Sequence, residues 1–166
     1  MVQGQLVSLS LDHKDTLETF LREFEISGDE LHGYFFDRSA HIEKVIVTLE
    51  AWSKGKELID GWVPNSTWFW EIKGVLQGVI NVRHRLNPWL EENGGHIGYS
   101  VAPSHRQQGV ATAMLSATLL KCRGLEISKT MLICDSDNVG SIRAIEANNG
   151  ILERENRGQR WYWIEL

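Results

Sequence analysis

The sequence has 166 residues and a formal net charge of −5, and it contains no basic tail or stripe. This length suits one domain with a single sizeable core, and 42% hydrophobic with 23% charged residues is typical of globular proteins. The acidic balance excludes nucleic acid as a partner, because phosphates require clustered Lys and Arg, and it favours a neutral or cationic substrate.

Cysteine content and apolar runs indicate the cellular setting. Cys122 and Cys134 are too few for a disulfide framework and are expected to be buried thiols. No pair of Cys or His residues has metal-ligand spacing, so no metal is expected. Residues 1–10 lack the features of a signal peptide, and no stretch approaches the roughly 18–20 apolar residues of a membrane span. We expect a cytoplasmic protein without a membrane partner.

The first elements in chain order are a strand and two helices. Residues 5–11 alternate as a strand, and Asp12 can cap the helix that follows. Gly28 ends that helix. Ser39 can cap a second helix, whose apolar periodicity fades near residue 54.

A three-strand meander is predicted next. After a loop at residues 55–66, two β-rich runs at 67–72 and 75–84 predict an antiparallel hairpin. Residues 85–95 are expected to be a polar connection, and 96–101 a further strand.

The last third alternates helices and strands. A helix is predicted at 109–123, stopped by Gly124 as a left-handed C-cap, followed by a buried strand at 130–135. A short helix follows at 138–148. The chain closes with a hairpin of residues 151–156 and 159–166 around Arg157-Gly158. The whole chain, 1–166, is thus expected to be a single α/β (α+β) domain. Its sheet is mixed and mostly antiparallel, with helices on its faces and a strand–helix–strand crossover at 96–135.

The turn HRQQGVA, residues 105–111, connects a strand to a helix in a way that favours anion binding. A helix N-terminus presents unpaired N–H groups and the positive end of the helix dipole. Gly109 lets an anion approach the backbone closely, Ala111 is nearly as slim, and Arg106 offers a donor fork suited to a diphosphate. The turn matches neither the P-loop nor the GxGxxG motif.

These residues resemble the signature of the GNAT superfamily of acyl-CoA-dependent N-acetyltransferases. The signature is a strand, V-x-P, then [RQ]-x-x-G-x-[GA] opening a helix. It is matched by Val101-Ala102-Pro103 and by the run from Arg106 to Ala111. The resemblance extends in element order over residues 65–155. It implies a GNAT-like fold and acetyl-CoA as co-substrate, wedged between two splayed strands at 96–101 and 130–135.

The resemblance also implies which residues contact acetyl-CoA. The pantetheine arm is expected to pair with the backbone near Tyr99 and Val101, and to meet Asn138 and Ser141, which have the family's N-x-x-[AS] spacing. Asn138 can equally serve as a helix cap. The pyrophosphate is expected on the loop and first helical turn, formed by Arg106, Gln107, Gln108, Gly109, Val110, Ala111 and Thr112.

The general acid of the reaction is not assigned by the sequence. Many family members have a tyrosine where this chain has Ile145, and Tyr99, Ser141 and Cys134 stand as alternatives. A thiol with a pKa near 8.5 can also leave as an anion. A covalent mechanism through Cys134 does not fit its place in a buried strand.

The expected reaction is direct attack of a primary amine on the thioester in a ternary complex. The resemblance implies a base on the strand before the cradle, where this chain has His96, and histidine titrates in the useful range; a hydrogen-bonded structural role is the alternative. Candidate acceptor-binding residues are Glu71, His84, Arg85 and Asn87, with Glu91 and Glu92 nearby. Trp68 and Trp70 share one sheet face and are interpreted as core.

The leading hypothesis is an N-acetyltransferase acting on a small-molecule or peptide amine, as a monomer or homodimer. A non-catalytic acyl-CoA-binding regulatory module on the same fold is the alternative, motivated by Ile145. An unrelated α/β domain binding another phosphate ligand is a third possibility. The acceptor amine is not named by the sequence, because acceptor loops vary freely on one fold.

Overall fold

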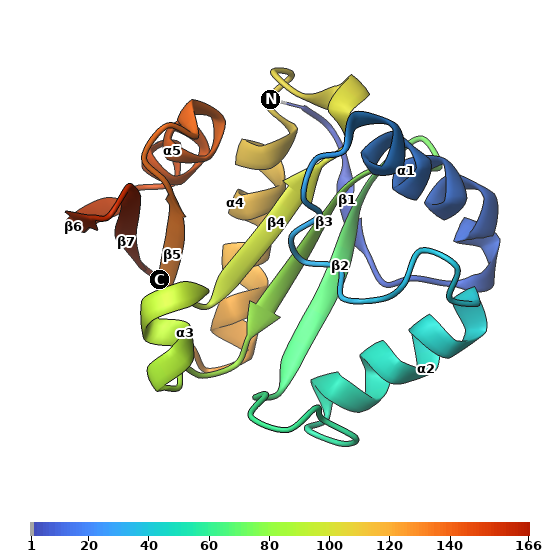
Figure 1. Ribbon diagram of the computed structural model, residues 1–166, viewed down its shortest axis with the longest axis horizontal. Helices are drawn as coiled ribbons and strands as arrows, with labels where there is room; N and C mark the ends of the chain where they lie inside the picture. The colour runs from blue at the N-terminus through green and yellow to red at the C-terminus, as the bar shows by residue number, and fades with distance from the viewer. Residues whose placement is uncertain (1) are drawn as a thin grey trace.

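Seven strands form two sheets in the computed structural model, which describes residues 2–166 (Figure 1). The first sheet has the order β1 (Gln5–Val7), β2 (Asn65–Ile72), β3 (Val75–Arg83) and β4 (Ile97–Val101). The second has the order β5 (Lys129–Asp135), β7 (Gln159–Glu165) and β6 (Ile151–Asn156). All ladders are antiparallel, so the expected α/β class with mostly antiparallel pairing is confirmed, while the expected single sheet is divided in two.

Five α-helices accompany the sheets among the described residues. They are α1 (Lys14–Ser27), α2 (Ile42–Ser53), α3 (Pro88–Asn93), α4 (Val110–Gly124) and α5 (Val139–Ala147). Two short 3-10 turns precede α1 and α4, at Leu11–His13 and Pro103–His105.

Each face of the first sheet is covered by helices because side chains alternate along its strands. Phe69 and Val79 point to one face and pack with residues of α1 and α2. Trp70 and Ile80 point to the other face and pack with Val110, Met114 and further residues of α4. Trp68 joins this second cluster, which confirms the core interpretation of the Trp68–Trp70 pair.

Both predicted hairpins are confirmed. Lys73 and Gly74 have φ of 50° and 80°, and Arg157 and Gly158 have φ of 48° and 77°. Two consecutive left-handed residues are the geometry of a type I′ turn, which matches the twist of the flanking strands.

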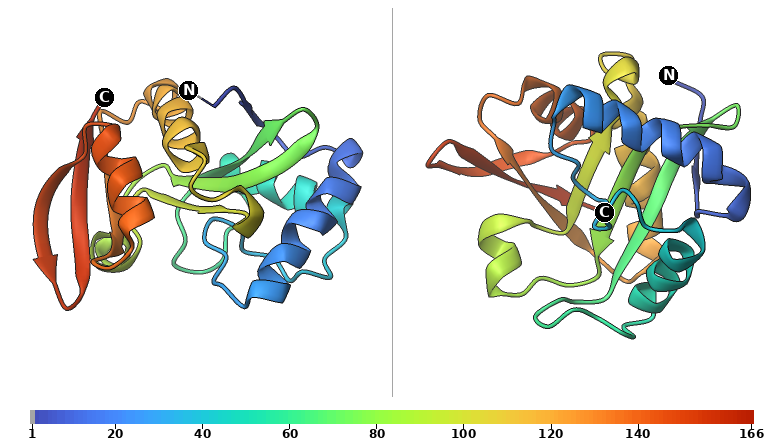
Figure 2. Two further views of the ribbon diagram at one scale, coloured as in Figure 1. Left: turned by 90° about the horizontal axis from the view of Figure 1, so that it is seen from above. Right: turned by 45° about the vertical axis from the view of Figure 1, so that its right-hand side comes forward.

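Among the described residues, the two sheets are hydrogen-bonded to each other at one end of β4 and β5 and diverge beyond it. Gly95 forms an isolated bridge with Leu132, and the His96 N–H donates to the Met131 carbonyl at 2.8 Å. Figure 2 shows the second sheet and α5 standing apart from the first sheet, with α4 between them. Beyond the contact at residues 95–96, the edge of β4 that faces β5 carries no strand partner.

Two predicted helix starts are wrong. Asp12 lies inside the first 3-10 turn, which begins after Ser10, and α1 starts at Lys14. The His13 Nδ1 atom accepts from the Ser10 N–H at 2.9 Å, so the side chain of His13 closes this turn. Ser39 instead bonds Asp37, its N–H donating to Asp37 Oδ1 at 2.8 Å, and α2 begins after His41.

Two further expectations fail between residues 85 and 126. The expected connection at 85–95 contains α3, whose start is fixed by Pro88 in its first turn and by Asn87 Oδ1, which accepts from Leu90 N–H at 2.9 Å. Gly124 is the last helical residue of α4 rather than a left-handed cap, and the left-handed residue is Glu126, with φ of 60°.

Candidate functional site

A cleft of about 300 Å³ opens where β4 and β5 diverge. Tyr99 and Gly98 line it from β4, Cys134 and Asp135 from β5, and Asn138, Ser141 and Ile145 from the α5 region. The loop that follows α1 contributes Leu31, His32, Gly33 and Phe35. The cleft thus brings residues from four distant parts of the chain to the unpaired edge of β4.

The free edge of β4 presents backbone groups to this cleft. The Arg83 N–H donates to the His96 carbonyl and the Ala102 N–H to the Gln77 carbonyl, which fixes the hydrogen-bonded pairs between β3 and β4. Since these pairs alternate along an antiparallel ladder, the backbone groups of Tyr99 and Val101 point away from β3. Tyr99 lines the cleft, whereas Val101 does not, and the Val101 carbonyl accepts from Arg106 Nε.

The start of α4, which follows β4 in the chain, forms a cradle of backbone N–H groups. Gly109 is the N-cap residue with φ of 81°, a left-handed conformation that a side chain would strain. Within residues 2–166, none of the N–H groups of residues 107–112 donates to a protein acceptor. The first helical residue, Val110, is buried, whereas Ala111 and Thr112 are partly exposed. An anion can therefore be held by several unpaired donors at this helix end.

Two side chains and one left-handed backbone residue shape the loop that leads into the cradle. Arg106 donates from Nη1 to Asp29 Oδ2 at 2.7 Å and from Nε to the Val101 carbonyl at 3.1 Å. The Arg106 guanidinium in turn holds the pKa of Asp29 below its ordinary value. Gln108 donates to the Ser104 carbonyl at 3.0 Å, and Gln107 takes a left-handed φ of 59°. Arg106 thus holds the loop against the α1–α2 region instead of pointing freely into the cradle.

Asn138 caps α5 next to the cleft, since its Oδ1 accepts from the Ser141 N–H at 3.1 Å. The capping role is therefore real, and both residues also line the cleft. The Tyr99 hydroxyl is buried without a hydrogen-bond partner of good geometry. Burial raises the pKa of Tyr99 to about 12, an effect that the Ser141 side chain partly opposes.

Ile145 and Cys134 line the same cleft in apolar surroundings. Ile145 is 1% exposed and belongs to the core cluster around α4. Both cysteines are free and buried, as predicted, and burial raises the pKa of each thiol to about 11. A thiol with so high a pKa is a poor nucleophile, which agrees with the rejection of a covalent cysteine mechanism.

The geometry of His96 argues against its expected role as the base. His96 is 7% exposed, and its Nδ1 accepts a hydrogen bond from the Met131 N–H at 2.9 Å. The lone pair that a base would use is therefore engaged, and the remaining ring nitrogen of the neutral tautomer carries the proton. Burial, with the nearby Arg83 charge, lowers the pKa of His96 to about 4.

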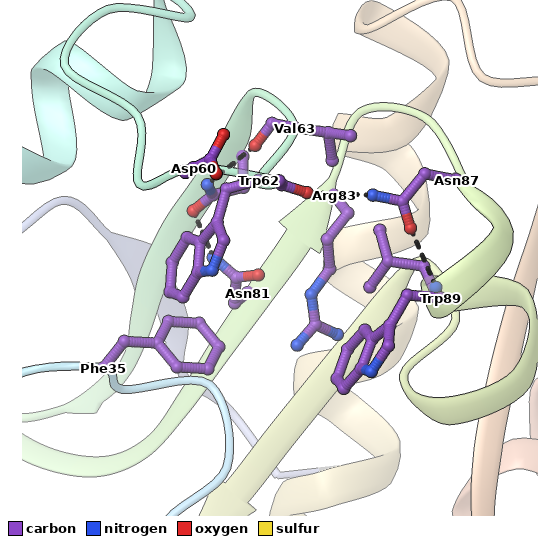
Figure 3. Close-up of a pocket in the computed structure, with 11 residues that line it drawn as sticks. Phe35, Asp60, Trp62, Val63, Asn81, Arg83, Asn87 and Trp89 are labelled. Carbon is purple, nitrogen blue, oxygen red and sulfur yellow. Dashed lines mark hydrogen bonds between the residues drawn. The ribbon is translucent and has the colours of Figure 1, made fainter.

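A second cavity of about 420 Å³ adjoins the cleft, and Phe35, Arg83 and Trp89 line both (Figure 3). Its walls come from the end of β3, the loop before β2, the loop after α1 and the start of α3. Further lining residues are Asp60, Gly61, Trp62, Val63, Asn65, Asn81, Asn87 and Leu90. The end of the β4–β5 cleft thus opens into a chamber large enough for a small molecule.

The predicted acceptor residues lie in different places. Asn87 lines the second cavity, where its Nδ2 donates to the Gly61 carbonyl at 3.0 Å. Glu71 lies at the far end of β2 and contacts His13 Nε2 at 3.0 Å. His84 contacts the Ser66 hydroxyl at 2.9 Å, and Arg85 is exposed. Neither Glu71, His84 nor Arg85 lines a described cavity, so the structure does not bring them to the site.

Glu91 and Glu92 also lie away from both cavities. The Glu91 carbonyl accepts from Trp161 Nε1 at 3.0 Å, and the Glu92 carboxylate pairs with Arg154 at 3.1 Å. The sequence analysis did not predict that Phe35, Trp62, Asn81 and Arg83 line a cavity. Asn81 could have been identified from the sequence, because an asparagine inside an apolar strand must either find hydrogen-bond partners or face a cavity.

Neither a membrane-spanning helix nor a metal-binding cluster is found in the described part of the chain. None of its helices has the length and apolar content needed to cross a bilayer. Residues 2–166 contain no grouping of three or more His, Cys, Asp or Glu residues suited to hold a metal ion.

Comparison with known proteins shows one matching family and many solved structures with a similar fold. The acetyltransferase (GNAT) family matches residues 48–151, which is more than half of the chain. No curated protein matches the chain by sequence.

Three solved structures illustrate the structural likeness. An acetyltransferase from Salmonella typhimurium that modifies the N-terminal serine of ribosomal protein L7/L12 is 15% identical with a TM-score of 0.69, covering 100% of this chain and 96% of that one. The microcin C7 self-immunity acetyltransferase MccE, in complex with acetyl-CoA and AMP, is 15% identical with a TM-score of 0.66, covering 100% and 94%. An N-acetyltransferase from Staphylococcus aureus Mu50 is 13% identical with a TM-score of 0.65, covering 99% of each chain. At such identities the likeness shows a shared fold.

Proposed function

Because the chain belongs to the GNAT family and is therefore an acyltransferase, we propose that it transfers the acetyl group of acetyl-CoA to a primary amine within a ternary complex. The observation that carries the proposal is that the cleft at the free edge of β4 and the second cavity adjoin, because Phe35, Arg83 and Trp89 line both. The chain continues from β4 into the unpaired N–H groups at the start of α4.

Acetyl-CoA fits the residues along this path. The donors of residues 107–112 suit its pyrophosphate, with close approach permitted at Gly109. The cleft-facing backbone groups of Tyr99 suit the amides of the pantetheine arm, since they lack a strand partner. The thioester then comes to lie near Tyr99 and Ser141, in the cleft whose Phe35, Arg83 and Trp89 also line the second cavity.

In the transfer step the amine lone pair attacks the thioester carbon. A C–N bond forms, the C–S bond breaks and coenzyme A leaves as a thiolate. The amine proton passes to water at the mouth of the second cavity, where the exposed carboxylate of Asp60 lies. His96 takes no part in this proton transfer, because its Nδ1 lone pair is engaged by Met131.

Tyr99 assists the leaving group by hydrogen bonding rather than by proton transfer. Its pKa of about 12 lies well above the roughly 8.5 of a free thiol, so transfer of its proton to the thiolate is unfavourable. A buried hydroxyl without a partner can nevertheless donate to a developing negative charge.

Two measurements test the proposal. Calorimetry should show acetyl-CoA binding, and absence of binding at high micromolar ligand would refute it. Thiol release should then be followed against a broad panel of primary amines. Binding without release against the whole panel would point instead to an acyl-CoA-binding module.

A further inference from the structure

The second cavity contains a cation that no carboxylate neutralises. Arg83, at the end of β3, is partly buried, and the surface it retains lines the two cavities. Among residues 2–166, no Asp or Glu forms an ion pair with it. Its one side-chain hydrogen bond, from Nη1 to the Gly94 carbonyl, is long at 3.4 Å. Burial of an unpaired charge is costly, so such a group suits an anionic ligand.

The backbone of β4 makes room for this guanidinium. A Cβ at Gly98 would lie only 3.0 Å from Arg83 Nη1, so glycine lets the side chain lie against the strand. On its other side the guanidinium lies over the Phe35 ring, 5.6 Å from its centroid. Figure 3 shows the side chain projecting toward Phe35, with Trp89 on the opposite side in this view. Arg83 is thus held at the junction of the two cavities.

Asn81, two residues earlier on β3, adds an unused acceptor. Its Nδ2 donates to Asn65 Oδ1 at 2.8 Å and to Thr67 Oγ1 at 3.0 Å. Asn65 is itself fixed, because its Nδ2 donates to the Val63 carbonyl at 3.0 Å. With both amide protons used, Asn81 Oδ1 remains buried without a partner, and Asn81 lines the cavity. An unpaired acceptor in a cavity suits a ligand N–H.

The remaining walls of the cavity are apolar and aromatic. Trp62 and Phe35 pack edge to face at 5.1 Å, and the exposed ring of Trp89 stands at the rim. Planar rings of this kind bury a flat or bulky apolar group well.

Resting on the proposed function, we infer that the acceptor is a free amino acid with an aromatic or large apolar side chain. Its carboxylate binds Arg83, its amine lies near Asn81 Oδ1, two residues from Arg83 on β3, and its side chain fills the cavity between Phe35, Trp62 and Trp89. A carboxylate matches the guanidinium fork in two parallel hydrogen bonds. Because the carboxylate and amine of an amino acid share one carbon, binding at Arg83 places the amine beside the thioester.

The positive charge of Arg83 disfavours cationic acceptors, although the negative net charge of the chain favours them. Asp60 is the one carboxylate among the residues that line the second cavity, and it lies exposed at the mouth. A polyamine or aminoglycoside would bring several positive charges against Arg83 without compensation.

The test uses three matched pairs that differ only in the carboxylate: L-tryptophan and tryptamine, L-phenylalanine and phenethylamine, and L-leucine and 3-methylbutylamine. Binding of each compound to the free protein and to its coenzyme A complex is measured by calorimetry, and thiol release from acetyl-CoA gives kcat/KM. We expect the best carboxylated compound to exceed its decarboxylated partner by at least about tenfold, as for one charge-assisted hydrogen bond.

Variants assign the preference to Arg83. Arg83→Gln should reduce kcat/KM for the preferred amino acid by about tenfold or more and leave its decarboxylated partner within about threefold, while Arg83→Lys should lie between. Arg85→Gln, an exposed arginine two residues away, is the matched control and should change neither. Acetyl-CoA affinity and the thermal transition of each variant verify that its fold is retained.

The outcomes separate the two proposals. If acetyl-CoA fails to bind, the proposed function fails, and amino-acid binding to the free protein still decides the assignment of the cavity. If acetyl-CoA binds but no carboxylated compound binds at millimolar concentration, the acceptor inference is overturned. It is equally overturned if the decarboxylated amines are preferred, or if the carboxylate preference survives in Arg83→Gln.

Discussion

His96 Nδ1 accepts the Met131 N–H at 2.9 Å, and this contact joins β4 to β5 at the closed end of the cleft. Together with the bond from the His96 N–H to the Met131 carbonyl, it makes residue 96 the point where the two sheets are joined. The splay of the strands, and hence the cleft, begins directly beyond it. His96 is therefore a structural residue at the vertex of the site.

Replacement of His96 should affect stability more than chemistry. His96→Ala should destabilise the fold by about 1–3 kcal/mol, because the buried Met131 N–H loses its acceptor. His96→Asn, whose side-chain oxygen can accept the same bond, should recover much of this loss and keep kcat within about threefold of the parent. Thermal unfolding and thiol release measure the two effects. A large loss of kcat in a stable His96→Asn variant would restore the general-base role.

The free energy of unfolding should fall at acidic pH, because burial of His96 disfavours its protonated form. The pKa of His96 is lowered from 6.5 to about 4, so the unfolded state binds a proton that the folded state does not bind between these values. The contribution of His96 is complete above pH 6.5 and is lost as the pH falls toward 4, by up to roughly 3 kcal/mol. Denaturant unfolding from pH 7.5 to 4.5 measures the slope, which should be shallower in His96→Asn.

Substitutions of the two glycines at the ends of α4, Gly109 and Gly124, should have opposite effects on stability. Gly109→Val should weaken acetyl-CoA binding by at least about tenfold and destabilise the fold by about 1–2 kcal/mol, because φ of 81° is strained for a β-branched residue. Gly124→Ala, where nothing lies within 4 Å of the added Cβ, should leave acetyl-CoA affinity unchanged and stabilise the helix slightly. Calorimetry and thermal unfolding compare them. Undiminished affinity in Gly109→Val would refute the cradle.

Tyr99→Phe tests the hydrogen bond to the leaving group. Removal of this buried hydroxyl should lower kcat by about 10-fold or more while acetyl-CoA affinity stays constant, as expected for a bond that forms with the developing thiolate. Single-turnover thiol release separates chemistry from binding. An unchanged rate would mean that Tyr99 serves only in packing.

Arg106→Gln should change acetyl-CoA affinity by less than about threefold, because its guanidinium is exposed and engaged by Asp29 and the Val101 carbonyl. Asp29→Asn, which removes the charge of the partner in the Arg106–Asp29 ion pair, is the matched variant. A loss of affinity in Arg106→Gln that Asp29→Asn does not share would indicate a direct contact of Arg106 with the pyrophosphate.

Cys134→Ser should retain activity within about threefold, since a thiol with a pKa of about 11 is not a nucleophile at neutral pH. Mass spectrometry during turnover should likewise detect no acetylated protein intermediate. Acetylation at Cys134 would overturn direct transfer.

The sequence by itself determined the order of the strands and of the described α-helices other than α3, both hairpins and the start of α4. These depend on local chemistry: periodicity within a segment, a type I′ turn at Lys73-Gly74, and a glycine where the backbone turns left-handed. The family signature around Gly109 could be identified for the same reason, because a cradle of consecutive N–H groups is built from consecutive residues.

Only the tertiary structure decided which residues line the second cavity. The second cavity joins Phe35, Trp62, Arg83 and Trp89, whose spacing along the chain carries no periodic signal. The orientation of Asn81 depends on Asn65 and Thr67 across the β2–β3 ladder, and the state of His96 depends on Met131, 35 residues away. A local pattern reports the torsions of its own segment, whereas burial, charge pairing and unused hydrogen-bonding groups are set by the residues that the fold brings alongside.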